Sequence, residues 1–195
     1  MANTIPPDLL LDCYRRGMFP MAMAGELRLF SPDPRGILPI GGFHVPHGTR
    51  KTLNDPAWEL RIDTSFEEIV RSCAHREETW IDGTILQSCL ELHALGYAHS
   101  VEVWRDGRLA GGLYGVAIGG AFFGESMFHR VSGASKVALC HLADLLRDGG
   151  FLLHDTQWVT PHLARFGGIE ISRCEYLELL GEALEAEVRG PFARY

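Results

Sequence analysis

The stretch AFFGESMFHRVSGASK, residues 121–136, contains the change from a strand pattern to a helix pattern that decides the fold. It begins with three apolar residues, Ala121 to Phe123, and after Gly124 comes the acidic Glu125. A short apolar run of this kind is typical of a buried strand. The stretch therefore predicts a strand that carries a carboxylate near its end, and a carboxylate in such a place needs a cationic partner or a chemical role.

A helix is expected directly after this strand, over residues 132–147. Ser132 can cap its N-terminus, and Gly149 and Gly150 can end it. Apolar residues recur between these ends at the spacing of one helix face, at Val137, Leu139, Leu142, Leu145 and Leu146.

The strand after the helix leads to two more polar side chains. Residues 151–154 are apolar at first, and Asp155 and Gln157 follow. On an extended chain, side chains two residues apart point the same way. Glu125, Asp155 and Gln157 are therefore expected to converge at neighbouring strand ends, beside a helix N-terminus.

The preceding residues read as antiparallel strands and further helices. Strands are predicted at 58–62 and 99–104, and Asp106-Gly107 is typical of a hairpin turn that returns the chain through 108–118. Thr64 and Glu67 have the spacing of a capping box. Two hairpins followed by strand, helix and strand predict an α+β fold, whose mixed and mostly antiparallel sheet carries helices on both faces.

A small N-terminal lobe is expected before this domain. Residues 8–16 favour a short helix, and residues 18–21 follow as an apolar loop. Two prolines make residues 31–36 a rigid turn. We place the boundary there, with a lobe at 1–33 and a catalytic domain at 34–195.

Composition is that of a soluble globular protein, with 46% hydrophobic and 22% charged residues in 195. The net charge of −7 comes wholly from the part after residue 76 and gives no sign of a nucleic-acid partner. Acidic and basic residues interrupt the N-terminal apolar run, so neither a signal peptide nor a membrane contact is expected, and we predict a cytoplasmic protein. The five cysteines are expected to be reduced.

Three other kinds of site have partial signals in the sequence. His44 and His47 lack further ligands at matching spacing, so no metal is expected. Ser126 is one place late for the nucleophile elbow of serine hydrolases. Arg130, Gly133 and Ser135 nearly match the loop that holds pyrophosphate in acyl-CoA transferases, so an acyl-CoA-dependent N-acetyltransferase stays open as the alternative function.

Several separate motifs together resemble the leucyl/phenylalanyl-tRNA–protein transferases. They occur in order over roughly residues 9–180: SPDPRG (31–36), FHVP (43–46), GESMF (124–128), ASK (134–136), D-x-Q (155–157) and HL (162–163). The resemblance implies an enzyme that takes Leu, Phe or Met from aminoacyl-tRNA. It joins this residue to an N-terminal Arg or Lys of a protein and so marks that protein for degradation in the N-degron pathway. It also implies an acetyltransferase-like (GNAT) domain.

This chemistry assigns roles to the three converging groups. The donor is already an activated ester, so no cofactor is expected. Glu125 is expected to recognise the guanidinium or ammonium of the acceptor. Gln157 would aim the attacking amine, and Asp155 would orient Gln157 or take the proton itself.

The substrates are the 3′ end of aminoacyl-tRNA and a protein or peptide, and we expect a monomer. The donor pocket is inferred from apolar residues, with Trp80 and the rim residue Met21 assigned through the resemblance and Leu113 and Phe122 as walls. Helix N-terminal amides near Ser132 and Ser135, together with Lys136, are expected to meet the terminal phosphate of the tRNA.

Overall fold

The computed structural model describes residues 4–76 and 78–193. Its elements in chain order are α1 (Pro7–Arg15), β1 (Phe19–Met23), β2 (Glu26–Phe30), β3 (Arg35–Ile37), the 3₁₀ turn η1 (Ile40–Gly42), α2 (His47–Leu53), β4 (Glu59–Ile62), α3 (Phe66–Ala74), α4 (Gly83–Ala94), β5 (Ala98–Arg105), β6 (Arg108–Ile118), β7 (Ala121–His129), α5 (Ala134–Gly149), β8 (Leu153–Gln157), α6 (Pro161–Ala164), β9 (Ile169–Ile171) and α7 (Arg173–Leu184).

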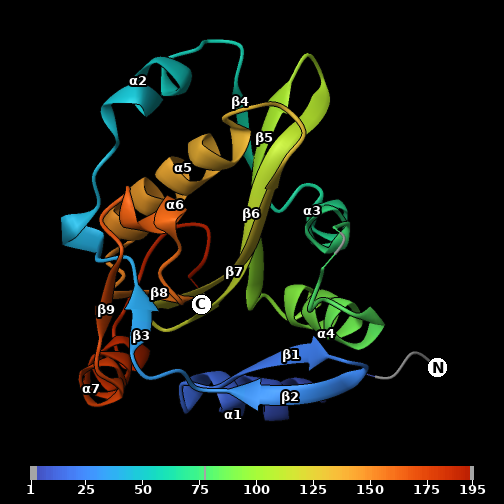
Figure 1. Cartoon of the computed structure of the whole chain (residues 1–195), viewed down its shortest axis with the longest axis vertical. Helices are drawn as coiled ribbons and strands as arrows, with labels where there is room; N and C mark the ends of the chain where they lie inside the picture. The colour runs from blue at the N-terminus through green and yellow to red at the C-terminus, as the bar shows by residue number, and fades with distance from the viewer. Residues whose placement is uncertain (1–3, 77, 194–195) are drawn as a thin grey trace.

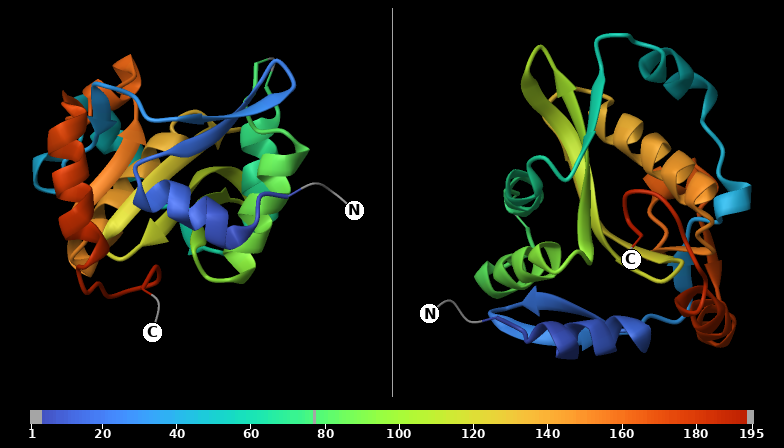
Figure 2. Two further views of the ribbon diagram at one scale, coloured as in Figure 1. Left: turned by 90° about the horizontal axis from the view of Figure 1, so that it is seen from below. Right: turned by 180° about the vertical axis from the view of Figure 1, so that it is seen from behind.

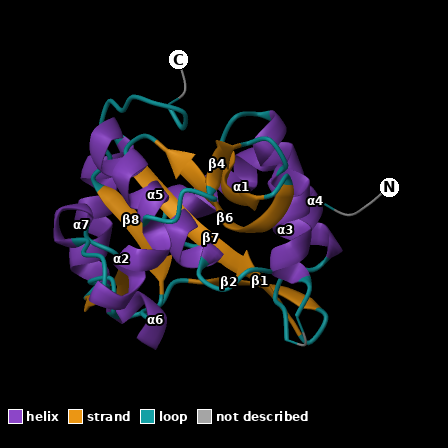
Figure 3. Cartoon of the chain, turned by 90° about the horizontal axis from the view of Figure 1, so that it is seen from above, coloured by secondary structure: helices purple, strands orange, loops and turns teal. Residues whose placement is uncertain are grey.

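The main sheet is mixed and mostly antiparallel, as predicted. Its strand order is β4-β5-β6-β7-β8-β3-β9, and only β7 and β8 run parallel. In Figure 1, α5 covers one face of β5 to β7, while α3 and α4 cover the other. Figure 3 shows the same layers from above. The predicted class, a mixed sheet with helices on both faces, is therefore confirmed.

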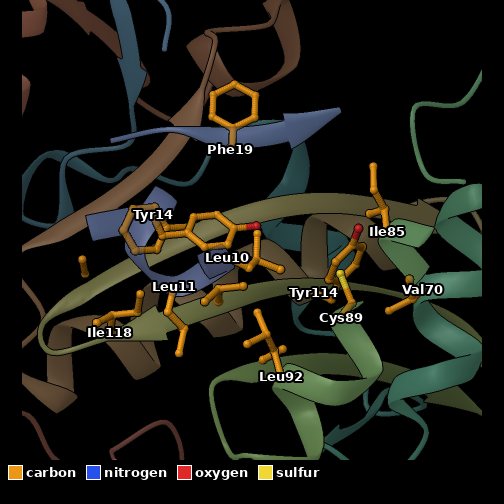
Figure 4. Packing of buried hydrophobic residues seen from close by; sticks show 14 of the residues in the cluster. Leu10, Leu11, Tyr14, Phe19, Val70, Ile85, Cys89, Leu92, Tyr114 and Ile118 are labelled. Carbon is orange, nitrogen blue, oxygen red and sulfur yellow. The ribbon is translucent and has the colours of Figure 1, made fainter. Parts of the chain in front are cut away.

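The N-terminal residues form a small lobe of α1 and the two-stranded sheet β1–β2. Figure 2 shows this lobe lying across one end of the main sheet. Leu10, Leu11 and Tyr14 of α1 are buried in the same core cluster as Leu92 and Tyr114 of the main domain, as Figure 4 shows. The lobe is thus packed onto the domain through apolar contacts. The exact division after residue 33 stays a prediction.

The parallel pair in the middle of the sheet is short. β8 pairs with β7 only at Ala121, Phe122 and Phe123. From Gly124 onward β7 pairs only with β6, whereas the end of β8 pairs with β3. The two central strands therefore separate in the middle of the sheet, at Gly124.

The expected apolar loop at residues 18–21 is wrong, because β1 occupies this stretch. The hairpin turn lies at Ala24 and Gly25, whose φ angles are 52° and 79°. Both central residues of such a turn are left-handed, which Asn-Gly and Asp-Gly favour and alanine rarely adopts. The sequence Ala-Gly therefore gave no hairpin signal.

Two predicted helix starts also differ. The N-cap of α3 is Ser65 without a side-chain cap, because the Thr64 hydroxyl donates instead to buried Glu102 of β5. The N-cap of α5 is Gly133, with a left-handed φ of 91°, and not Ser132. Gly150 ends α5, as expected, and Thr160 caps α6.

The five cysteines are free thiols. Cys13, Cys73, Cys89 and Cys140 are buried thiols, and Cys174 is an exposed one.

None of the helices within residues 4–76 and 78–193 combines the length and apolar character needed to cross a bilayer.

Candidate active site

A cavity of about 340 Å³ lies where β7 and β8 separate. Both strands contribute to its wall, and so do the lobe, β6, α5 and α6. The lining residues are Phe19, Met21, Arg76, Trp80, Leu113, Tyr114, Gly124, Glu125, Ser126, Met127, Leu139, Leu142, His154, Thr156, Gln157, Trp158, Thr160, His162 and Leu163.

The lining of the cavity comes from both hydrophobic cores. One end is apolar and belongs to the core under α5, with Leu113, Leu139 and Leu142 in its wall. The other end faces the lobe, where Phe19 and Tyr114 belong to the opposite core. Because its lining comes from both cores, the cavity reaches from one face of the sheet to the other.

Glu125 enters this cavity from a β-bulge. Tyr114 pairs with Ser126 and Gly115 with Gly124, so Glu125 is an extra residue in β7. A bulge of this kind redirects a side chain locally. The Tyr14 hydroxyl of α1 donates a 2.8 Å hydrogen bond to Oε1 of Glu125, which connects the carboxylate to the lobe.

The pKa of Glu125 is also shifted from its ordinary value. Burial raises its pKa to about 7, and the charge of Asp155 acts in the same direction. The hydrogen bond from Tyr14 and the charge of Arg35 oppose this rise. Near neutral pH the carboxyl group is therefore divided between its two protonation states, and a cation in the cavity would favour the ionised one.

Asp155 lies behind the cavity wall and not in it. It is 0% exposed, and its oxygens accept from Arg35 Nε at 2.9 Å and Arg35 Nη2 at 2.5 Å. The Tyr176 hydroxyl donates to Oδ2 at 2.8 Å, and the backbone N–H of Gln157 donates to Oδ1 at 2.9 Å. Asp155 thus joins β3, α7 and the end of β8.

Gln157 faces the cavity from a turned backbone. Its φ is 61°, and the N–H of Trp158 donates to the carbonyl of Thr156 at 2.7 Å across it, which makes a γ-turn. The alternation expected of a strand ends here, so Gln157 lines the cavity while Asp155 does not. Of these two residues, which are expected to point the same way, only Gln157 therefore lines the cavity.

The amide of Gln157 is available to a ligand. The residue is 7% exposed, and its Nε2 has no hydrogen-bond partner within residues 4–76 and 78–193. Thr156 Oγ1 and His162 Nε2 are likewise buried without a partner in that part of the chain, and both residues line the cavity. Buried polar atoms without partners are costly unless water or a ligand satisfies them.

The expected pocket residues divide between the two ends. Leu113 lies at the apolar end under α5, and Met21 and Trp80 lie at the lobe end. Phe122 is not in the lining. Its ring packs on Phe192 at 5.4 Å between ring centres.

The expected phosphate contacts also lie outside the lining. Ser132, Ser135 and Lys136 are at the start of α5, where a side chain on Gly133 would meet Thr52 of α2 at 2.5 Å. Arg130 donates to Glu68 Oε1 at 2.8 Å and to Ser72 Oγ at 3.0 Å. The residues that nearly match a pyrophosphate loop are therefore partly covered by α2 and α3.

Arg35 and His154 are among the residues around the site that the sequence did not indicate. Arg35, 1% exposed, lies in the stretch expected to form a rigid turn, and its partner Asp155 lies 120 positions away, so no local pattern could reveal the pair. His154 lies next to Asp155 on a strand, and side-chain alternation could have placed it on the other face. In the described ranges there is also no group of three His, Cys, Asp or Glu residues that could hold a metal ion.

Comparison with solved structures finds matches of low similarity. A GCN5-related N-acetyltransferase from Kribbella flavida matches with a TM-score of 0.46 and 15% identity, over 85% of this chain and 61% of that one. A GCN5-related N-acetyltransferase-like protein from Streptococcus suis gives a TM-score of 0.33 and 13% identity, over 94% of this chain and 64% of that one.

Comparison with known sequences finds much closer similarity. The family model described as leucyl/phenylalanyl-tRNA protein transferase matches residues 37–181, and the model of its N-terminal domain matches residues 3–33. A relative named leucyl/phenylalanyl-tRNA–protein transferase from Akkermansia muciniphila is 50% identical, over 96% of this chain and all of its own. One of the same name from Paramagnetospirillum magneticum is 55% identical, over 91% of this chain and 88% of its own. The chain therefore belongs to the leucyl/phenylalanyl-tRNA–protein transferase family.

Proposed function

We propose that this protein moves Leu, Phe or Met from aminoacyl-tRNA to the α-amine of an N-terminal Arg or Lys of an acceptor protein. The new N-terminal residue marks the acceptor for degradation in the N-degron pathway of the cytoplasm. The observation that carries the proposal is the two-ended cavity, in which a carboxylate and an unpartnered amide lie beside an apolar pocket. Family membership supports the same activity.

The donor's side chain binds at the end of the cavity under α5. Leu113, Leu139 and Leu142 give this end apolar walls, and burial of an apolar side chain there is favourable. Met21 and Trp80 at the lobe end offer a surface for the terminal nucleoside, and the tRNA itself stays outside.

The acceptor's cation binds to Glu125. An ionised carboxylate in a partly buried site binds a guanidinium or ammonium and disfavours a neutral side chain. Tyr14 fixes the direction of the carboxylate through its hydrogen bond. This contact would select Arg and Lys at the N-terminus of the acceptor.

Gln157 positions the reacting groups. The neutral amine attacks the carbonyl carbon of the ester, the bond from that carbon to the ribose oxygen breaks, and this oxygen takes the proton that the amine gives up. No cofactor is needed, because the ester is already activated. Asp155 acts as a positioning residue, since it holds the backbone of Gln157 and its oxygens are occupied by Arg35 and Tyr176.

The function is tested with two donors and one acceptor. The protein is incubated with an Arg-starting peptide and either radiolabelled Phe-tRNA or labelled acetyl-CoA. Label is expected in the peptide with Phe-tRNA and not with acetyl-CoA. The reverse result would support the acetyltransferase alternative and would overturn the proposal.

An Asp-starting peptide serves as the acceptor control. Its side chain carries the same sign of charge as Glu125, so it is expected to receive no label. Gel filtration of the same preparation tests the expected monomer.

A further inference from the structure

The apolar end of the cavity contains a polar group that the proposed reaction does not use. His154 of β8 is 3% exposed and lines the cavity. Neither of its ring nitrogens hydrogen-bonds to a residue in the described ranges. A side chain built on Gly124 would come within 3.1 Å of Nε2, so this nitrogen lies where the two strands begin to separate.

The surroundings of His154 are otherwise apolar. Its ring stands edge-on to Phe122, with 5.8 Å between ring centres. Leu139 and Leu142 of α5 line the same end of the cavity. Burial lowers the pKa of His154 to about 4, so the imidazole is neutral at cytoplasmic pH and offers one N–H donor and one acceptor nitrogen.

We propose that His154 lets this cavity accept a donor whose aromatic side chain carries a hydroxyl group, tyrosine in the first place, in addition to wholly apolar donors. A phenolic O–H can donate to the free ring nitrogen or accept from the ring N–H. An apolar side chain in the same place displaces water from the imidazole and leaves it unpaired, which costs free energy. This inference rests on the proposed function and concerns its donor specificity.

The experiment compares three donors on one tRNA. The same tRNA is charged with Phe, with 4-methyl-Phe or with Tyr, and kcat/KM is measured with an Arg-starting peptide. Tyr and 4-methyl-Phe have nearly the same shape, so their ratio isolates the hydroxyl group. In the unmutated protein we expect Tyr to be used about tenfold better than 4-methyl-Phe, as one good hydrogen bond implies.

A variant locates this preference at His154. In His154→Leu the ratio of Tyr to 4-methyl-Phe is expected to fall at least about tenfold. His141→Leu is the matched control, because His141 lies on α5 outside the cavity lining, and its ratio is expected to equal that of the unmutated protein.

Each outcome has one meaning. Equal use of Tyr and 4-methyl-Phe by the unmutated protein, with Phe transferred normally, overturns this inference and leaves the proposed function standing. An unchanged ratio in a folded His154→Leu variant also overturns it. Absence of transfer from all three donors overturns the proposed function. Should His154→Leu fail to fold, the donor series on the unmutated protein decides alone.

Discussion

Glu125 is a residue whose charge depends on small changes of pH. Because burial raises its pKa to about 7, only about a tenth of the molecules carry the ionised carboxylate at pH 6, and about nine tenths do so at pH 8. The groups around it are Tyr14, Asp155 and Arg35. Recognition of a cation should therefore strengthen as the pH rises through 7.

The first prediction concerns this pH dependence. Binding of an Arg-starting peptide is expected to tighten about ninefold between pH 6 and pH 8, following the ionised fraction of Glu125. In Glu125→Gln the rise should be absent, and binding of the donor should change much less than binding of the peptide. Calorimetric titration at several pH values measures both. Equal losses of affinity for the donor and for the peptide would show that Glu125 does not specifically recognise the acceptor.

The second prediction concerns stability, which is expected to change with pH in the opposite direction to peptide binding. The folded-state pKa of Glu125 lies above its ordinary value of 4.5, so folding favours its protonated form. The free energy of unfolding is therefore expected to decrease as the pH rises from about 4.5 to about 7, relative to Glu125→Gln. Urea unfolding of both proteins at pH 5 and pH 7.5 checks this. A constant difference between the two proteins would contradict it.

At the scale of residues, the sequence predicted the identity of the polar side chains better than it predicted their positions. Glu125 and Gln157 do line one cavity. Asp155 is expected beside them, but it is bound by Arg35 and Tyr176 and does not line the cavity, and no residue near it in the sequence indicates these distant partners. His154 could have been found, since a histidine beside a buried aspartate lies on the opposite face of a strand.

At the scale of elements, the Arg35–Asp155 pair connects two strands of the sheet and the helix α7. Arg35 lies on β3, Asp155 on β8, and Tyr176 of α7 donates to the same carboxylate. Arg35 also donates to the carbonyl of Gly17 at 2.8 Å and lies over the ring of Tyr176, 4.3 Å from its centre. Burial lowers the pKa of Arg35, but the hydrogen bond and charge of Asp155 outweigh this, so the net shift of the Arg35 pKa is upward and Arg35 stays charged.

The third prediction is a comparison of single and double variants of this pair. Asp155→Leu leaves Arg35 buried without its partner and is expected to cost about 3–5 kcal/mol of stability. Asp155→Leu combined with Arg35→Met should cost clearly less than the single change, because no charge remains buried. Urea unfolding measures both. A double variant that loses the sum of the two single losses would show that the two side chains act independently.

Most elements could be predicted, because hydrophobic periodicity and turn residues mark them. The hairpin at Asp106-Gly107 lies where the pattern puts it. The missed features depend on distant partners or on unusual turns: Thr64 is engaged by Glu102, and Ala24 adopts a left-handed conformation. Local sequence rules do not include such contacts.

At the scale of the whole molecule, the lobe completes the site. Phe19 and Met21 of β1 line the cavity, and Tyr14 of α1 holds Glu125. The lobe is fixed at Gly17, where a side chain would come within 2.8 Å of the Tyr176 ring of α7. Docking of the lobe and the geometry around Asp155 are therefore coupled through Tyr176.

The fourth prediction separates this coupling from backbone strain. Gly17 and Gly25 have similar φ angles of 72° and 79°, but only Gly17 has neighbours within 4 Å of an added side chain. Gly25→Ala should cost about 1 kcal/mol from strain alone, and Gly17→Ala about 2–3 kcal/mol more from overpacking, with a loss of turnover. Thermal unfolding and kcat of both variants provide the test. Equal effects at the two sites would exclude the coupling.

The bulge at Glu125 separates this carboxylate from the pairing of its hairpin. Tyr114 already lies opposite Ser126, and Gly115 opposite Gly124, so deletion of Glu125 would leave both flanking registers unbroken. The acid is in effect an insertion into a hairpin that is complete without it. The sheet can therefore present this charged group to the cavity without giving up a position of its ladder.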